Sequence, residues 1–151
     1  MVLLAFELDD TLIPSSPDMF DTEPPRNWWR RWFVQEHLRV GSNRLLSTLS
    51  GICELWVYTT SMRGSMYVRF LLGAYGGRIR GVVNGDRHMR WLKKQPRHLR
   101  CPQYPPAYDI DLIVDDSEGV AVEGRQLGYQ VLLIRPDDLD WTSKILKAVG
   151  R

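Results

Sequence analysis

The sequence predicts an α/β domain in which a mainly parallel β-sheet is covered by helices on both faces. Segments with strand character alternate with segments with helical character along the whole chain. The strongest strands, at residues 2–8 and 110–114, are continuous apolar runs, which are typical of strands buried on both faces. The chain has 151 residues, enough for one substantial core but too few for two. We therefore expect a single domain over residues 1–151, with the architecture of a Rossmann-like three-layer sandwich.

Five strands and six helices account for most of the chain. The strands are expected at residues 2–8, 52–59, 79–83, 110–114 and 129–134. The helices are expected at residues 27–38, 42–49, 63–75, about 87–95 and 117–127, followed by a last helix that carries Trp141, Ile145 and Val149. Ser42 is expected to cap the second helix, and Gly76 and Gly128 end two others. Residues 13–51 then form a small helical insert between the first two strands.

Composition excludes several classes of protein. The hydrophobic share is 44% and the charged share 25%, as in ordinary globular domains. No apolar run approaches the ~20 residues that a membrane-spanning helix needs, and the first residues lack the basic flank of a secretory signal. Cys53 and Cys101 stand far apart, without the spacing of a disulfide framework or of a metal site. We therefore expect no membrane partner, and the cytoplasm as the compartment.

Charge is distributed unevenly along the chain. The formal net charge is only +2, but residues 60–101 hold ten Lys and Arg and a single acid, Asp86. Residues 1–25 and 102–142 are acidic. A solvated surface accounts for this pattern, and so does a middle third that faces an anionic partner, since clustered arginines suit phosphate groups. Both interpretations stay open at this point.

Polar residues follow three of the predicted strands. Acidic clusters come after the first and fourth strands, at residues 7–10 and 115–116, and a hydroxyl cluster comes after the second, at residues 59–61. In parallel sheets, ligands bind beyond the carboxyl ends of the strands. Carboxylates that converge there repel one another unless protons or cations neutralise them. Mg²⁺, which prefers oxygen ligands, is the cofactor we expect.

These clusters resemble the motifs of the haloacid dehalogenase (HAD) superfamily. The segment Phe6-Glu7-Leu8-Asp9-Asp10-Thr11-Leu12 is similar to its first motif, an apolar strand followed by Asp-x-Asp-x-Thr. Residues 58–61 resemble the second motif. Residues 110–116, an apolar strand that ends in two Asp, resemble the fourth. The resemblance covers most of the chain in the right order.

The resemblance implies a role for each matching residue. Asp9 takes the position of the general acid and base, and Thr59 that of the phosphate-binding hydroxyl, with the backbone N–H of Thr60 nearby. Asp115 and Asp116 take the positions of the metal ligands, to which Glu7 and the backbone carbonyl of Asp9 also contribute. The expected site therefore comprises catalytic Glu7, Asp9, Thr59 and Lys94, phosphate-binding Thr59 and Thr60, and metal-binding Glu7, Asp9, Asp115 and Asp116.

The chain departs from the family pattern at two of these positions. Glu7 stands where the family has its nucleophilic Asp, and its carboxylate lies one methylene farther out. Because a misplacement of 1 Å costs about 10²-fold in rate, this change preserves binding more readily than chemistry. The third motif requires a Lys or Arg, and we assign it to Lys94, with Lys93, Arg97 and Arg100 as alternatives. Gln103 also stands near the expected place, but it supplies no charge.

The short insert makes the chain similar to the capless members of the family, whose open sites accept macromolecular phosphates. Within it, Trp28, Trp29 and Trp32 have a spacing that favours a packing stripe on a helix, and the alternative is that one Trp stacks on a ligand at the rim of the site.

Three functions follow from this reading of the sequence. The first is a Mg²⁺-dependent phosphoric monoester hydrolase acting on phosphorylated substrates, macromolecular ones included. The second is a non-catalytic module that binds nucleic acid or another polyanion through the basic residues 63–100. The third is a metal-dependent nuclease or phosphotransferase in which Glu7 serves only as a metal ligand.

Overall fold

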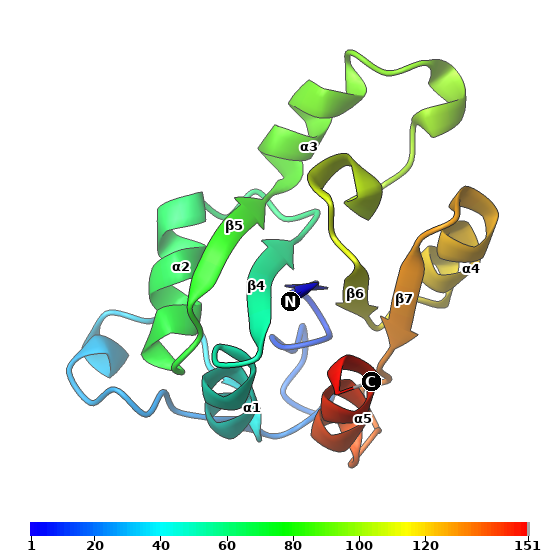
Figure 1. Cartoon of the computed structure of the whole chain (residues 1–151). Coiled ribbons are helices and arrows are strands. Elements are labelled where there is room, and N and C mark those ends of the chain that lie inside the picture. The colour runs from blue at the N-terminus through cyan, green and yellow to red at the C-terminus, as the bar shows by residue number, and fades with distance from the viewer. Residues whose placement is uncertain (151) are drawn as a thin grey trace.

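A computed structural model describes residues 1–150 and contains one five-stranded sheet in which every pairing is parallel (Figure 1). The strand order is β5-β4-β1-β6-β7. The strands are β1 (Val2–Phe6), β4 (Cys53–Tyr58), β5 (Ile79–Val83), β6 (Leu112–Asp115) and β7 (Gln130–Leu133). The predicted α/β fold with a parallel five-stranded sheet is therefore confirmed, and each predicted strand is present to within a few residues.

Helices cover both faces of the sheet. The α-helices are α1 (Ser42–Leu49), α2 (Ser65–Ala74), α3 (Gly85–Leu92), α4 (Glu118–Leu127) and α5 (Trp141–Val149). One core cluster joins α1, α2 and α5 to the face of β1 that carries Leu4 and Phe6. A second cluster joins α4 to the opposite face, which carries Ala5 and Ile113. The molecule is thus a three-layer sandwich with two separate cores.

The remaining elements are short. The 3₁₀ helices are η1 (Arg30–Trp32), η2 (Arg97–Leu99) and η3 (Pro105–Tyr108), and β2 (Thr22–Glu23) pairs with β3 (Leu38–Arg39) in a separate two-stranded sheet. The segment from α3 to η2 projects from the body of the domain in Figure 1. It leaves the sheet after β5 and returns to it at β6.

The pairing register of β1 aligns the carboxyl ends of β1, β4 and β6. Phe6, the last residue of β1, pairs with Val57 of β4 and with Val114 of β6. Because the three strands are parallel, the residues that follow them lie at one edge of the sheet. The residues after β1, after β4 and at the end of β6 are those of the three polar clusters.

The predicted helix at residues 27–38 is wrong. Only the single 3₁₀ turn η1 forms there, and the insert is mostly irregular. Aromatic and Asn residues are weak helix formers, and the backbone N–H of Asn27 is instead bonded to the carbonyl of Ala74 at the end of α2. The packing stripe predicted with this helix is also wrong, because Trp28 and Trp32 are 73% and 80% exposed.

The predicted cap of α1 is wrong as well. Ser42 is the first residue of the helix, and its hydroxyl donates to the carbonyl of Arg39. The capping position belongs to Gly41, which has a φ of 98°, in the left-handed region that glycine adopts without steric cost.

Candidate functional site

The carboxyl group of Glu7 lies at the centre of the predicted site. Glu7 follows β1 directly and is only 5% exposed. Its Oε1 accepts hydrogen bonds from the Thr59 hydroxyl at 2.7 Å and from the Leu8 backbone N–H at 2.9 Å. The structure therefore brings together the ends of β1 and β4 through the residues predicted as nucleophile and phosphate ligand.

Gln103 joins Glu7 to the end of β6. Its Nε2 donates to Glu7 Oε2 at 2.7 Å and to Asp115 Oδ2 at 3.1 Å. Gln103 and Asp115 are 2% and 1% exposed, so this bridge is shielded from solvent. An uncharged amide thus occupies the space between the two carboxyl groups.

Lys94, which we assigned to the third motif, lies elsewhere. It is exposed in the turn after α3, and so are Lys93, Arg97 and Arg100. Within residues 1–150, none of these four side chains forms an ion pair or hydrogen bond with a carboxylate of the site. The reason is geometric: the segment from α3 to η2 projects outward, and the chain returns to the site only at Gln103.

Burial and charge explain the protonation of this cluster. Burial raises the pKa of Glu7 from 4.5 to about 7, and the hydrogen bonds from Thr59 and Leu8 only partly offset this effect. Burial also raises the pKa of Asp115, as does the neighbouring charge of Asp116. The Gln103 amide donates to both carboxyl groups, and the raised pKa of Glu7 favours a proton there, which further reduces their mutual repulsion.

Asp9 and Asp116 lie nearer to the surface. Asp116 Oδ1 accepts from the Thr11 hydroxyl at 3.2 Å, and burial raises the pKa of Asp116. Asp9 forms an ion pair with Arg63, whose Nη1 lies 3.0 Å from Asp9 Oδ1. The predicted acid/base residue is therefore held by a cation that the sequence analysis did not assign.

Arg63 connects the site to the insert. Its guanidinium donates to both carboxylate oxygens of Glu36, and the Tyr67 hydroxyl donates to Glu36 Oε2 at 2.9 Å. Burial tends to raise the pKa of Glu36, but the hydrogen bonds from Arg63 and Tyr67 outweigh it and lower that pKa. These bonds also raise the pKa of Arg63, so Arg63 stays charged. In the sequence, the position of Arg63 four residues after Thr59 is what could have indicated a cation near the site.

The hydroxyl cluster after β4 keeps one group free for a ligand. Thr59 is fully buried, and its Oγ1 also accepts from the Ser61 N–H at 3.2 Å. Thr60 is exposed, and within residues 1–150 its N–H is bonded to no backbone or side-chain acceptor. The Thr60 N–H is therefore a donor available to an anion at this edge.

The donor atoms of the site suit Mg²⁺ in kind, but their arrangement does not gather them around one point. Carboxylate oxygens are the ligands that Mg²⁺ prefers. However, no group of three His, Cys, Asp or Glu side chains in residues 1–150 is arranged to hold a metal ion. Glu7 and Asp115 face the N–H groups of Gln103, and Asp9 faces Arg63. Mg²⁺ binding therefore remains a prediction.

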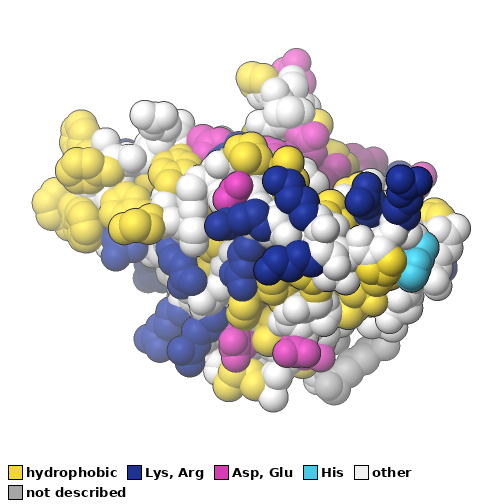
Figure 2. Space-filling view, turned by 90° about the horizontal axis from the view of Figure 1, so that it is seen from above, with side chains coloured by type: hydrophobic (Ala, Val, Ile, Leu, Met, Phe, Trp, Pro, Cys, Tyr) yellow, Lys and Arg dark blue, Asp and Glu magenta, His cyan; other side chains and the backbone are white. Residues whose placement is uncertain are grey.

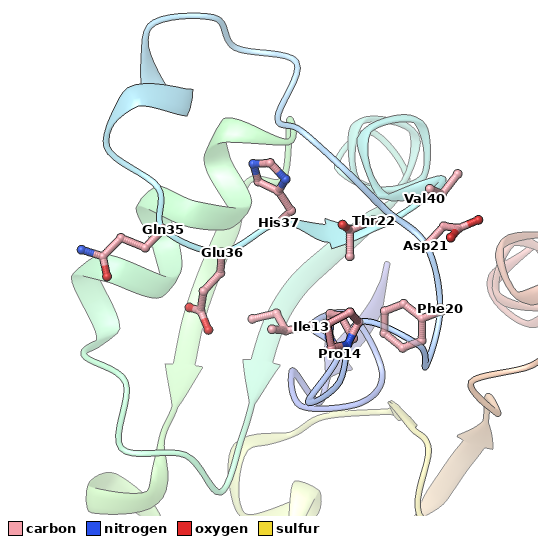
Figure 3. A pocket seen from close by; sticks show the side chains of 10 residues that line it. Ile13, Pro14, Phe20, Asp21, Thr22, Gln35, Glu36, His37 and Val40 are labelled. Atoms are coloured by element: carbon pink, nitrogen blue, oxygen red, sulfur yellow. The ribbon is translucent and has the colours of Figure 1, made fainter.

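A groove lies beside this network, on the insert side. Its volume is about 830 Å³, and its lining includes Ile13, Phe20, Glu36 and His37. Figure 3 shows Ile13, Pro14 and Phe20 opposite His37 and Thr22. None of the predicted site residues lines this groove, so it is separate from the carboxylate cluster.

No protein-family model matches the chain, and no curated protein sequence matches it. The fold and the site define an α/β domain with a buried carboxylate cluster at the carboxyl edge of its sheet.

Proposed function

We propose that the chain is a phosphatase-type, HAD-like domain that binds a phosphorylated ligand together with Mg²⁺ but does not hydrolyse it. The observation that carries this proposal is the bridge from Gln103 Nε2 to both Glu7 and Asp115. In the HAD pattern, a Lys or Arg of the third motif steadies the charge of the site. An amide in a bridging position supplies hydrogen bonds without that charge.

The chemistry of Glu7 supports the loss of hydrolysis. A carboxyl group attacks phosphorus only when it is ionised and free to approach in line. Burial gives Glu7 a pKa of about 7, and both of its oxygens accept hydrogen bonds. Its extra methylene also displaces the carboxylate relative to an Asp, and displacements of about 1 Å are costly.

The same edge of the sheet retains groups for binding. The Thr60 N–H is a hydrogen-bond donor for phosphoryl oxygens, and the Thr59 hydroxyl becomes one when it turns away from Glu7. Asp115, Asp116 and the backbone carbonyl of Asp9 are the oxygen ligands proposed for Mg²⁺. Bound there, Mg²⁺ would supply the positive charge that Gln103 lacks.

Restoring the two family residues tests the proposal. Phosphate release from an aryl phosphate is measured with and without Mg²⁺ for the wild type, Glu7→Asp, Gln103→Lys and the double variant. We expect no turnover by the wild type and Mg²⁺-dependent turnover by the double variant. Binding is measured from the thermal stability of the wild type in Mg²⁺ with a phosphate mimic, which we expect to rise with ligand concentration.

The matched control is Glu7→Asp combined with Gln95→Lys, which adds the same charge outside the site. Turnover by the wild type would refute the proposed loss of hydrolysis. A double variant that stays inactive, together with a wild type that gains no stability from Mg²⁺ and the mimic, would refute the phosphatase-type site itself.

A second candidate function is polyanion binding by the basic middle of the chain. Several of its arginines serve the fold: Arg69 donates to the carbonyls of Ile79 and Arg80, and Arg87 to that of Val82. Seven other basic residues are exposed: Arg78, Arg80, Arg90, Lys93, Lys94, Arg97 and Arg100. Figure 2, seen from above, shows a group of Lys and Arg side chains near the middle of that face. Binding to single-stranded DNA should then weaken steeply with salt, and affinity that is flat in salt would exclude this function.

The cytoplasm remains the proposed compartment. Cys53 and Cys101 are both free thiols buried in the fold, as is usual for proteins of reducing compartments.

A further inference from the structure

The insert exposes a cluster of large aromatic side chains. Trp28, Trp32 and Phe33 are 73%, 80% and 67% exposed, and Trp29 is 45% exposed. Contiguous apolar surface of this kind on a soluble domain marks a contact site. Figure 2 shows hydrophobic side chains gathered at the left end of the molecule, the side on which Figure 1 places the insert.

The exposed aromatic residues sit on an anchored turn. Trp29 packs edge-to-face against Phe33 and against Phe70 of α2, with ring centroids 6.5 and 6.2 Å apart. The Arg30 guanidinium lies over the rings of Trp29 and Phe70, 5.2 and 5.1 Å from their centroids. Because Trp29 and Arg30 are held against α2, the turn presents its other aromatic side chains outward.

The charge of this turn is positive. Residues 24–35 contain Arg26, Arg30 and Arg31 and no acidic residue, and Arg26 and Arg31 are exposed. A second copy docked here across a two-fold axis would place arginines against arginines. Charge complementarity instead requires an anionic partner.

The exposed aromatic side chains of the turn, Trp28, Trp32 and Phe33, do not line the five grooves described for residues 1–150. An exposed turn that combines Trp, Phe and Arg suits a lipid interface, where indole rings lie at the level of the headgroups and arginines bind lipid phosphates.

We infer that the turn formed by residues 26–33 is a contact site for an anionic lipid surface. The chain then lies against the surface through this turn without crossing the bilayer, which departs from our expectation of no membrane partner, an expectation that rested on the lack of a spanning segment. No helix in residues 1–150 is long and apolar enough to cross a membrane. This surface contact is independent of the phosphatase-type site, so either can fail without the other.

Sedimentation with vesicles tests the inference. The full chain is mixed at low salt with vesicles of phosphatidylcholine alone or with added phosphatidylglycerol, and Trp fluorescence is recorded in parallel. We expect binding only to the anionic vesicles, with a blue shift of the emission. Trp28→Ser with Trp32→Ser should lower the partition coefficient at least about tenfold, and Arg26→Gln with Arg31→Gln should lower it about 30-fold.

The matched controls change equally exposed residues elsewhere. Leu139→Ser removes a side chain that is 95% exposed near α5, and Arg125→Gln with Lys147→Gln removes two exposed charges from α4 and α5. Neither control should change the partition coefficient, and thermal melting verifies that every variant folds. The inference is overturned by any of three results: no binding to anionic vesicles, binding that the Trp and Arg variants leave unchanged, or a dimer in solution that the Trp variant dissociates.

Discussion

The Tyr58 hydroxyl donates a hydrogen bond to Nδ1 of His88, with 2.6 Å between the two atoms. The other ring nitrogen, Nε2, lies 2.7 Å from the carbonyl of Cys101, which only accepts, so Nε2 carries the proton. The Tyr58 oxygen also accepts from the Tyr104 N–H at 2.9 Å. This buried network joins the end of β4 to α3 and fixes the backbone on both sides of Gln103.

We predict that Tyr58→Phe destabilises the fold. The substitution leaves His88 Nδ1 and the Tyr104 N–H buried without partners, which costs about 1–3 kcal/mol. Urea unfolding measures the loss. Tyr129→Phe is the matched control, because the Tyr129 hydroxyl is buried without a partner and its removal should cost little. Equal losses in the two variants would contradict the proposed network.

The pH dependence of stability should be altered by Glu7→Gln. Between its unfolded value of 4.5 and its folded pKa of about 7, Glu7 keeps in the folded state a proton that the unfolded chain has lost. Below pH 4.5, Glu7 therefore contributes about 3 kcal/mol to the free energy of unfolding. This contribution is lost as the pH rises through 7.

Glu7→Gln removes this pH-dependent contribution. The free energy of unfolding of the variant, minus that of the wild type, should therefore rise from pH 5 to pH 8. Chemical denaturation at several pH values measures the difference. A difference that does not change with pH would show that Glu7 titrates normally.

His88 should make the free energy of unfolding depend on pH in the opposite direction from Glu7. Burial lowers its pKa from 6.5, so the unfolded state binds a proton that the folded state excludes. Stability from this group is present above pH 6.5 and is lost as the pH falls through the folded value. His88→Gln should therefore reduce the loss of stability in mild acid, which thermal melting between pH 5 and pH 7 measures.

Arg39 should be among the most sensitive positions outside the site. It is 3% exposed, and its Nη2 donates to the carbonyls of Arg135, Pro136 and Asp138. Arg39→Met removes the side-chain donor from these carbonyls, of which that of Arg135 still accepts from the Asp138 N–H, and should cost about 3 kcal/mol in urea unfolding. Arg44→Met, an exposed position on α1, should change stability by less than about 0.5 kcal/mol. A loss of similar size in both variants would argue against the anchoring role.

Gly81 on β5 should not tolerate a side chain. A Cβ atom there would lie 2.3 Å from the ring of Trp56 on the neighbouring strand. Gly81→Ala should therefore destabilise the fold by about 1–3 kcal/mol, through overpacking. Gly64→Ala, where nothing lies within 4 Å of the added atom, is the control and should be nearly neutral. Unfolding midpoints of the two variants provide the comparison.

The sequence was most informative where local pattern and tertiary packing agree. The apolar runs at residues 2–8 and 110–114 predicted buried parallel strands, and the acidic residues after them predicted that Glu7 and Asp115 lie close together. The bridge by Gln103 was not assigned, because residues 85–107 have no regular period and their path depends on the Tyr58–His88 network. The exposure of Trp28 and Trp32 was missed because aromatic residues at helical spacing usually indicate a buried face.

The central position of β1 has a consequence for the order of folding. Phe6 pairs with Val114, so β1, which is made before the other strands of this sheet, is hydrogen-bonded on both sides only after β6 has formed. Pairings so distant along the chain form slowly, since a long loop must close before any contact stabilises it. A nascent chain that has released only β1, β4 and β5 therefore leaves one edge of β1 open, and Glu7 meets Asp115 only when this last gap closes.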